Sequence, residues 1–228
     1  MGVSGLNRER VRLRWARVHA KEQKYISEHS GLNLPLKARI HAYLCGDGSV
    51  SWRKERNTEK IHADIRFYPD HKSLIAPFNG ALSEIYGRAA KVKKMRNFYK
   101  LSFTSMTVAQ DLLKDGPYSS TLWAIPDWII KNRACAREWL RAFFDAEAYV
   151  NDKRICVQCV NKKGILQIHE LLKQFNIESS LYTYRRENPN WNVNYHLVIQ
   201  KKHARNIFLK TLGFNHKEKM RKLNANVA

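Results

Sequence analysis

The stretch IHAYLCGDG, residues 40–48, sets an aspartate between two glycines directly after an apolar run. The spacing of apolar residues from position 36 onward predicts a helix that Gly48 terminates. Asp47 would then lie at the carbonyl end of this helix, where the helix dipole disfavours a carboxylate unless a cation or a donor offsets its charge. The alternative is a plain Asp-Gly turn after a helix.

A second stretch, LRAFFDAEA at residues 140–148, has the same design. Each stretch has an alanine five residues before its acid, at Ala42 and Ala142, and a small residue directly before the acid, at Gly46 and Ala146. Each predicted helix therefore carries two small residues four positions apart on one face, a spacing that lets helix backbones approach closely. We expect the two helices to pack against each other around a pseudo-two-fold axis.

Asp47 and Glu147 occupy matching positions in the two stretches. Packing of the helices would bring both side chains to one end of the seam between them. Two carboxylates placed there would repel strongly unless divalent cations lay among them, and hard cations prefer carboxylate oxygens. The sequence therefore predicts that both acids hold a metal.

The order of predicted elements also repeats. After each acid-terminated helix, the pattern predicts two strands, a helix, two more strands and a short closing helix. This favours an α+β fold made of two pseudo-symmetric αββαββα halves. The expected organisation is a basic N-terminal arm over residues 1–35, a first half over 36–130 and a second half over 131–228.

Charge narrows the class of partner. The chain of 228 residues has 41 Lys and Arg against 20 Asp and Glu, a formal net charge of +21, and its pI is near 10.0. Such a surplus favours a polyanion, above all nucleic acid. No apolar run approaches the roughly 18 residues of a membrane span, and the N-terminus lacks the apolar core of a secretory signal. We expect an intracellular protein with no membrane partner, in the cytoplasm or with organellar or nucleoid DNA.

Four cysteines are too sparse for a disulfide framework in a chain of this size. Cys156 and Cys159 form a CVQC that is compatible with half a zinc site or a redox pair. The flanking pattern is that of a strand, which would place the two thiols on opposite faces. A second cysteine pair is missing, so we do not predict a zinc site.

The two stretches resemble the two copies of the LAGLIDADG motif in monomeric homing endonucleases, over about residues 36–225. Cys45 stands where an acid is common in the family, and Ala148 replaces the final glycine of the second copy. The resemblance implies two antiparallel sheets that form a saddle in the DNA major groove. It also implies that Asp47 and Glu147 cut both strands with a divalent metal, normally Mg²⁺, for which Ca²⁺ or Mn²⁺ substitutes in binding.

Further site residues follow from the same resemblance. Family sites place a lysine near the scissile phosphate after the short helix of each half. The resemblance implies that Lys131, and Lys217 or Lys219, stabilise the charge that develops on the phosphorane. The backbone of Gly46 and Ala146 is expected to belong to the metal site. Polar residues that end the second strand of each half are candidates for positioning water: Asp70 or His71, and Gln158 or Asn161. Ordinary solvated lysines are the alternative for the three cations.

Direct reading of bases requires side chains that project from one strand face at every second residue. The alternating pattern predicts such a face in each half; the alternative for any single Lys or Arg is a solvated residue that guards an edge strand. In the first half its members are Ser49, Ser51, Arg53, His62, Asp64, Arg66, Tyr68, Lys91, Lys93, Arg96, Asn97 and Lys100. In the second half they are Arg154, Gln158, Tyr182, Tyr184, Arg186, Asn192, Asn194 and His196. The halves differ residue by residue, which predicts a monomer that binds a long asymmetric DNA target.

Three functions compete at this level. The first is a site-specific, metal-dependent DNA endonuclease, most simply a free-standing enzyme encoded in an intron, because the chain lacks the terminal residues of splicing chemistry. The second is an RNA maturase, with intron RNA as partner, or a DNA-binding protein that does not cleave. The third is an unrelated hydrolase with paired carboxylates, which would need a substrate pocket and fits the charge poorly. The presence of both acids favours the first.

Overall fold

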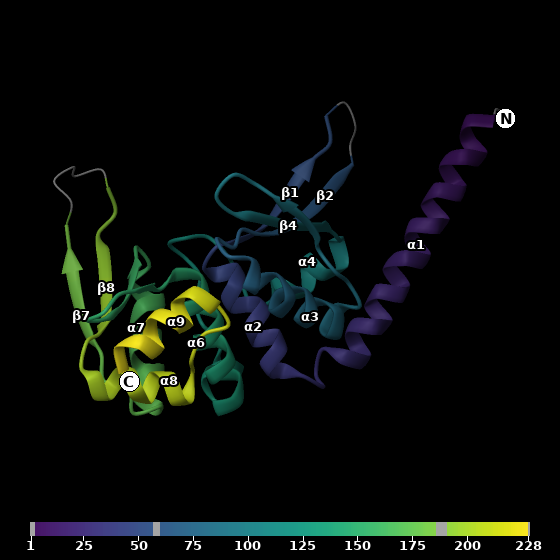
Figure 1. Cartoon of the computed structure of the whole chain (residues 1–228). Helices are drawn as coiled ribbons and strands as arrows, with labels where there is room; N and C mark the ends of the chain where they lie inside the picture. The colour runs from purple at the N-terminus through teal and green to yellow at the C-terminus, as the bar shows by residue number, and fades with distance from the viewer. Residues whose placement is uncertain (1–2, 57–59, 186–190, 228) are drawn as a thin grey trace.

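The computed structural model describes residues 3–56, 60–185 and 191–227, with side chains from residue 9 onward (Figure 1). The first part of the chain contains α1 (Val3–His29), α2 (Leu34–Cys45), β1 (Gly48–Lys54), β2 (Ile61–Phe67), a 3₁₀ turn (Lys72–Leu74), α3 (Ile75–Tyr86), β3 (Lys91–Lys94), β4 (Tyr99–Thr104) and α4 (Met106–Leu112). The rest contains α5 (Asp127–Ile130), α6 (Arg133–Glu147), β5 (Tyr149–Val150), β6 (Ile155–Cys159), α7 (Lys162–Gln174), β7 (Ser180–Tyr184), β8 (Asn194–Ile199), α8 (Lys202–Thr211) and α9 (Lys217–Val227).

The first half runs from α2 to α4 and forms an antiparallel sheet in the order β1-β2-β4-β3. Alternation along the strands sets its two faces, because successive side chains point to opposite sides. Ile65 and Phe67 of β2 and Leu101 of β4 are fully buried on the helix-facing side. The residues between them are polar and project from the other side.

The second half repeats this plan from α6 to α8, with the strand order β5-β6-β8-β7. Ile155, Val157 and Leu197 are fully buried beneath this sheet. The two halves therefore share element order and sheet topology, and the predicted α+β fold with two pseudo-symmetric αββαββα halves is confirmed. The predicted boundary at residue 130 falls at the end of α5, and the boundary at residue 35 falls in the first turn of α2.

Local capping explains where several helices begin and end. The side chain of Asn132 accepts hydrogen bonds from the backbone of Ala134 and Cys135 at the start of α6, and Ser105 does the same for Val108 in α4. Helix α3 ends at Gly87, whose φ of 61° lies in the left-handed region that glycine tolerates.

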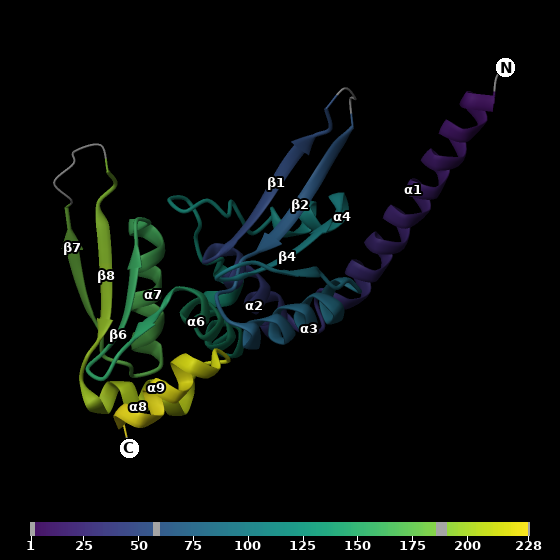
Figure 2. The ribbon, with the colours of Figure 1, turned by 45° about the horizontal axis from the view of Figure 1, so that its top comes forward.

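Helices α2 and α6 pack against each other at the centre of the molecule, between the two sheets (Figure 2). Ala42 and Ala142 are fully buried in this seam. Gly46 approaches α6 so closely that a Cβ on it would lie 2.9 Å from the Cβ of Ala146. The small residues of the two motifs thus form the contact face that their spacing predicts.

Helices α1 and α9 extend the repeat at its two ends in the chain, and the short α5 links the halves. Helix α1 packs on α3 and α4 through its C-terminal half and rises beside the first sheet, on the side away from the second sheet (Figures 1 and 2). Helix α9 follows α8 and contacts it and β5. Within the described residues, no helix has the length and apolar character that crossing a membrane requires.

Candidate metal centre and nucleic-acid interface

Asp47 and Glu147 lie at the same end of the α2–α6 seam. Helix α2 ends at Cys45, so Asp47 follows it by two residues, while Glu147 is the last residue of α6. A Cβ on Gly46 would lie 3.4 Å from Oε1 of Glu147, so the Glu147 carboxyl reaches the turn that carries Asp47. The structure therefore brings the two predicted metal acids together.

Burial raises the proton affinity of both acids. Loss of hydration raises the pKa of Asp47 to about 6, and the nearby charge of Asp70 adds to this rise. Loss of hydration raises the pKa of Glu147 to about 7, and the charge of Asp47 is the second cause. A divalent cation between the carboxylates would offset the same repulsion, so the pair is electrostatically suited to one.

Lys219 is the cation at this end of the seam. Its Nζ donates to the backbone carbonyls of Asp145 and Ala146, at 2.5 and 3.0 Å, and so caps the C-terminus of α6. A positive charge there is favourable because the helix dipole is negative at this end. Burial lowers the pKa of Lys219, whereas the charges of Asp47, Glu147 and two further acids raise it.

The other two predicted lysines are not brought to the acids in this way. Lys131 lies before the first residue of α6, so about 20 Å of helix separates it from Glu147. Its exposed Nζ pairs with Asp127 at 3.0 Å. Lys217 begins α9 and is exposed, and its backbone N–H donates to Ser73 Oγ at 3.1 Å. Of the three predicted lysines, Lys219 is the one whose charge acts on both acids.

A buried network behind the acids was missed by sequence reasoning. Asp145 is fully buried and accepts hydrogen bonds from Tyr43 Oη, Asn215 Nδ2 and the backbone N–H of His216. Burial raises the pKa of Asp145 to about 6 despite these donors. His216 Nε2 in turn lies 3.2 Å from Asp70 Oδ1. This network fixes the segment before α9 against the seam, and the only sequence signal for it was an acid at a buried position of the helix.

The candidates for positioning water separate into two kinds. Asn161 is buried as the N-cap of α7: its Oδ1 accepts from Gly164 and its Nδ2 donates to the carbonyl of Trp123. Gln158 is exposed, and it lines a cavity of about 280 Å³ together with Glu147. Both the oxygen and the nitrogen of the Asn161 amide are therefore used in hydrogen bonds within the protein. Gln158 instead lines the cavity beside Glu147.

In the first half, Asp70 is exposed and His71 is partly buried. The ring centroid of His71 lies 4.6 Å from that of His216. Asp70 influences the pKa of Asp47, whereas His71 is held by Ser73, whose Oγ lies 2.9 Å from His71 Nδ1. Of this pair, Asp70 is therefore the side chain whose charge acts on a predicted metal acid.

The chain supplies only part of a metal coordination sphere. Within residues 3–56, 60–185 and 191–227, no group of three or more His, Cys, Asp or Glu side chains is arranged to hold an ion. The carbonyl of Ala146, a predicted site member, accepts a hydrogen bond from Lys219. At Gly46, the other predicted member, the backbone N–H donates to the carbonyl of Ala42, and its own carbonyl takes no part in this bond. The two carboxylates fit a hard cation whose remaining ligands are water or substrate oxygens.

The outer face of the first sheet carries the predicted polar side chains. One row crosses all four strands through Ser49, Arg66, Ser102 and Lys91, and the next rows contain Ser51 with Asp64 and Arg53 with His62. Lys93 and Lys100 pair at the far edge of the same face. Arg96 and Asn97 lie exposed in the turn between β3 and β4. Tyr68 follows β2, and its backbone N–H donates to the carbonyl of Asp47.

Asp64 differs from the other members of this face because it is buried. Its Oδ2 accepts from Arg66 at 2.5 Å and from Arg53 Nε at 3.2 Å, and its Oδ1 accepts from Thr104 at 3.0 Å. Although burial opposes it, these donors lower the pKa of Asp64. Asp64 is therefore held by protein groups, and its carboxylate orients two arginines that project from the sheet.

The outer face of the second sheet is built from amides, aromatics and histidine. Gln158, His196 and Tyr182 form one row across three strands, and Asn194 pairs with Tyr184 beside it. The two tyrosines are exposed, whereas Asn194 is buried. His196 Nε2 is buried without a hydrogen-bond partner in the described part of the chain, so the ring does not present this nitrogen to a ligand in this conformation.

The remaining predicted contacts of the second half lie at its rim. Arg154 is exposed just before β6, and Asn192 is exposed just before β8. Arg186 lies outside the described residues. The second face therefore carries few cations where the first carries many, and the halves differ in surface chemistry although they share a fold.

Comparison with known proteins agrees with this architecture. Residues 134–213, which cover most of the second half, match the family model of the LAGLIDADG-like domain. The solved structure of I-DmoI in complex with DNA and Mn has a TM-score of 0.62 with this chain at 16% identity, and the match covers 78% of this chain and 96% of that one. Other I-DmoI structures contain DNA with Ca or, in a variant, Mg.

Full-length DUF199/WhiA from Thermatoga maritima has a TM-score of 0.54 at 13% identity, over 87% of this chain and 62% of that one. A separate structure of WhiA is described as its N-terminal LAGLIDADG domain. At these identities the likeness shows the fold alone.

A relative in sequence is glutamine--fructose-6-phosphate aminotransferase [isomerizing] of Methanocaldococcus jannaschii, which is 27% identical over 198 residues. The match covers 84% of this chain but only 17% of that protein. The chain thus corresponds to a small segment of a much longer protein.

Proposed function

We propose that this chain is a site-specific, divalent-metal-dependent DNA endonuclease, because residues 134–213 match the LAGLIDADG-like domain, the fold matches that of I-DmoI, and both motifs lie in one polypeptide. The observation that carries this proposal is the pair of carboxyls, one from each half, at the end of the α2–α6 seam. The seam lies between two sheets whose outer faces are polar, so a duplex lying across both sheets would pass over the acids.

The residues at the seam have separable tasks in this reaction. A bound divalent cation, Mg²⁺ in the simplest case, supplies Lewis-acid stabilisation of the phosphate and a water of lowered pKa. Asp47 and Glu147 would hold it through oxygen donors, while DNA phosphates and water complete its ligands. Lys219 holds the end of α6 in place and keeps a positive charge beside both acids. Gln158 lines the cavity beside Glu147 and is the candidate for orienting a water.

The two sheet faces support an asymmetric target. The first face presents Arg53 and Arg66, held by Asp64, a geometry suited to the acceptor pair of guanine. The second presents Gln158 with exposed tyrosines, which suits adenine edges and apolar base contacts. A single chain with two unlike faces has no need of a palindrome, and we expect it to act as a monomer.

Binding without cleavage is the competing function. WhiA has the same fold and a LAGLIDADG domain but is not named an endonuclease. The fold alone therefore does not establish cleavage. Cleavage is favoured by retention of both acids. Encoding within an intron and an intron RNA partner stay predictions, and we do not propose aminotransferase activity because the match covers 17% of that protein.

A plasmid library of randomised targets tests the proposal. The full chain is incubated with the library in Mg²⁺, linearised plasmids are sequenced, and binding to the recovered target is measured in Ca²⁺. The same assays are run on Asp47→Asn and Glu147→Gln, with Glu170→Gln on α7 as a matched control, since Glu170 is an exposed acid paired with Lys173.

Recovery of one long asymmetric target, cut by the chain and by the control but not by either seam variant, is the expected result. Each seam variant should keep binding within about tenfold. Target binding with no cutting by the unchanged protein would support the binding-only function instead. Normal cutting by both seam variants would exclude the assigned catalytic role.

A further inference from the structure

Helix α1 is anchored to the first half through its C-terminal part only. Glu22 is buried and accepts hydrogen bonds from Arg88 Nε at 2.7 Å and from Ser105 Oγ at 2.9 Å. Tyr25 Oη donates to the carbonyl of Ser83 at 3.2 Å. The most N-terminal of these polar contacts joins His19 to Thr107 at 2.9 Å. These contacts lie in the second half of the helix, so the part before His19 projects from the body.

The projecting part exposes apolar as well as basic side chains. Val11, Leu13 and Trp15 are 50%, 54% and 58% exposed. The structure shows that this basic arm continues the anchored part of α1 as one helix.

The basic residues of α1 form a stripe along one side. Arg10, Arg14, Arg17 and Lys21 recur at intervals of four, three and four positions, a spacing that aligns side chains on one helix face. All four are exposed. Within the described residues, none of them makes an ion pair or hydrogen bond, whereas Lys24, the next member of the stripe, pairs with Glu28 at 3.9 Å. The stripe is therefore a row of unneutralised positive charge about 17 Å long.

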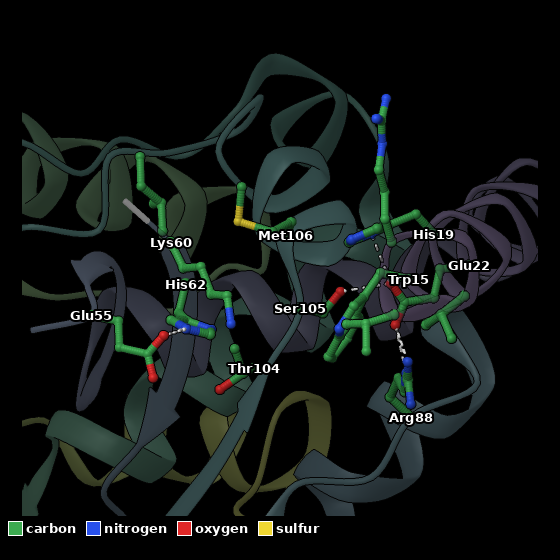
Figure 3. A pocket seen from close by; sticks show the side chains of 14 residues that line it. Trp15, His19, Glu22, Glu55, Lys60, His62, Arg88, Thr104, Ser105 and Met106 are labelled. Carbon is green, nitrogen blue, oxygen red and sulfur yellow. Dashed lines mark hydrogen bonds and ion pairs between the residues drawn. The ribbon is translucent and has the colours of Figure 1, made fainter. Parts of the chain in front are cut away.

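A groove separates this helix from the first sheet. Its volume is about 1020 Å³, and Trp15 and His19 of α1 form one wall while Lys60 and His62, at the start of β2, form the other (Figure 3). In both ribbon views α1 rises on the same side as the outer ends of β1 and β2, away from the second sheet. A duplex that lies across both sheets and continues past the first one would meet the projecting part of α1.

We propose that the α1 stripe, Arg10, Arg14, Arg17 and Lys21, binds the phosphate backbone of duplex DNA beyond the first-half end of the target. The unneutralised charge on one helix face favours a polyanion as partner. The position of α1 favours contact with the DNA that flanks the target on the side of the first sheet. This inference rests on the proposed DNA-binding function but not on cleavage. Contacts of this kind add affinity and salt dependence without sequence information.

The first test measures salt dependence on DNA of no particular sequence. Binding of the full chain to a labelled 60-bp random-sequence duplex is followed by fluorescence anisotropy over a range of KCl concentrations. The stripe variant is Arg10→Gln, Arg14→Gln, Arg17→Gln, which keeps good helix formers at these positions. The control variant is Lys162→Gln, Lys163→Gln, Lys210→Gln, which removes three exposed charges from α7 and α8.

The stripe variant should reduce the slope of log K against log salt by about 2–3, since each lost phosphate contact removes about 0.9. The control variant should change the slope by less than about 1. Equal slopes for the stripe variant and the unchanged protein, with an unchanged thermal midpoint for both, would overturn the proposal. Cleavage of the selected target is scored separately, so a chain that binds but never cuts contradicts the proposed function and not this inference.

The second test locates the contact. Hydrogen exchange of residues 9–18 is measured with and without the 60-bp duplex, and the proposal expects slower exchange of this segment when DNA is bound. In the stripe variant the slowing should be lost while that of β1 and β2 remains. Slowing that depends on protein concentration without DNA would instead identify a second copy as the partner, and would overturn the proposal.

Discussion

At the scale of single residues, the surroundings of a carboxyl decide its task. Asp64 and Glu147 are both partly or largely removed from water, but Asp64 has three donors around it whereas Glu147 has another acid. The pKa of Asp64 is accordingly lowered, and that of Glu147 is raised to about 7. The first carboxylate organises neighbouring side chains, and the second is ready to exchange a proton for a cation.

Replacement of Asp64 by Asn should relax recognition of the first half-site. The neutral amide retains the volume but loses the charge that holds Arg53 and Arg66, so their guanidinium groups sample more directions. We expect discrimination at the base pairs they contact to fall by about 1–3 kcal/mol, the worth of a bidentate base contact. Repeating the randomised target selection with this variant measures it. Unchanged preferences in the first half-site would show that Asp64 does not position these arginines.

The pH dependence of stability tests the raised pKa of Glu147. A folded pKa of about 7, above the ordinary 4.5, means that the folded chain retains a proton that the unfolded chain releases. Stability from this group is therefore present below pH 4.5 and is lost as pH rises to about 7. Glu147→Gln should be more stable than the unchanged protein at pH 8 without metal, by about 2 kcal/mol after allowance for screening.

Urea unfolding at pH 5 and pH 8 provides the measurement. The advantage of Glu147→Gln should shrink at the lower pH, and Mg²⁺ should stabilise the unchanged protein more than the variant. A variant that is less stable at both pH values would mean that the Glu147 carboxylate is satisfied in the folded chain.

At the scale of elements, the α2–α6 seam was predictable because its signal is local. Two small residues four apart in each motif specify the contact face, and the structure places Gly46 against Ala146 as expected. The sheet faces were predictable for the same reason, since alternation along a strand is visible in the sequence. Asn161 shows the limit: it lies one position before a helix and caps it, a role that the sequence N-K-K-G could have indicated.

Long-range contacts were beyond sequence reasoning. The hydrogen bonds from Lys219 to the end of α6 join positions more than seventy residues apart, and no spacing rule connects them. The prediction treated Lys131 and Lys219 as equivalent because each follows a short helix in its half. In the structure, Lys131 precedes α6, whereas Lys219 reaches the C-terminus of α6. Sequence order could thus suggest that a lysine lies near the acids without deciding which.

A Gly46→Ala substitution should loosen the seam at the end that carries the acids. The new Cβ would lie 2.9 Å from that of Ala146, so the substitution carries a steric cost. We expect a loss of about 1–3 kcal/mol in the free energy of unfolding. Ala146→Gly in the same chain should restore part of this loss, and urea unfolding of the four proteins gives the coupling. Additive effects would argue against direct contact.

At the scale of the whole molecule, duplication and divergence explain both the fold and its charge. The two halves share topology because both must bury the same seam and the same kind of sheet. Their outer faces are free to differ, and one carries arginines where the other carries amides and tyrosines. The net charge of +21 is shared almost equally, with +10 over residues 1–130 and +11 over residues 131–228, so the halves differ in where their charges lie and not in how many they carry.

Mn²⁺ binding by the full chain on its selected DNA target tests the central claim most directly, because electron paramagnetic resonance counts bound ions without relying on cleavage. The chain and the Glu170→Gln control should bind at least one Mn²⁺ tightly when DNA is present. The double variant Asp47→Asn, Glu147→Gln should lose that ion while it still binds DNA. Equal numbers of tightly bound Mn²⁺ in the double variant and the unchanged protein would contradict the account.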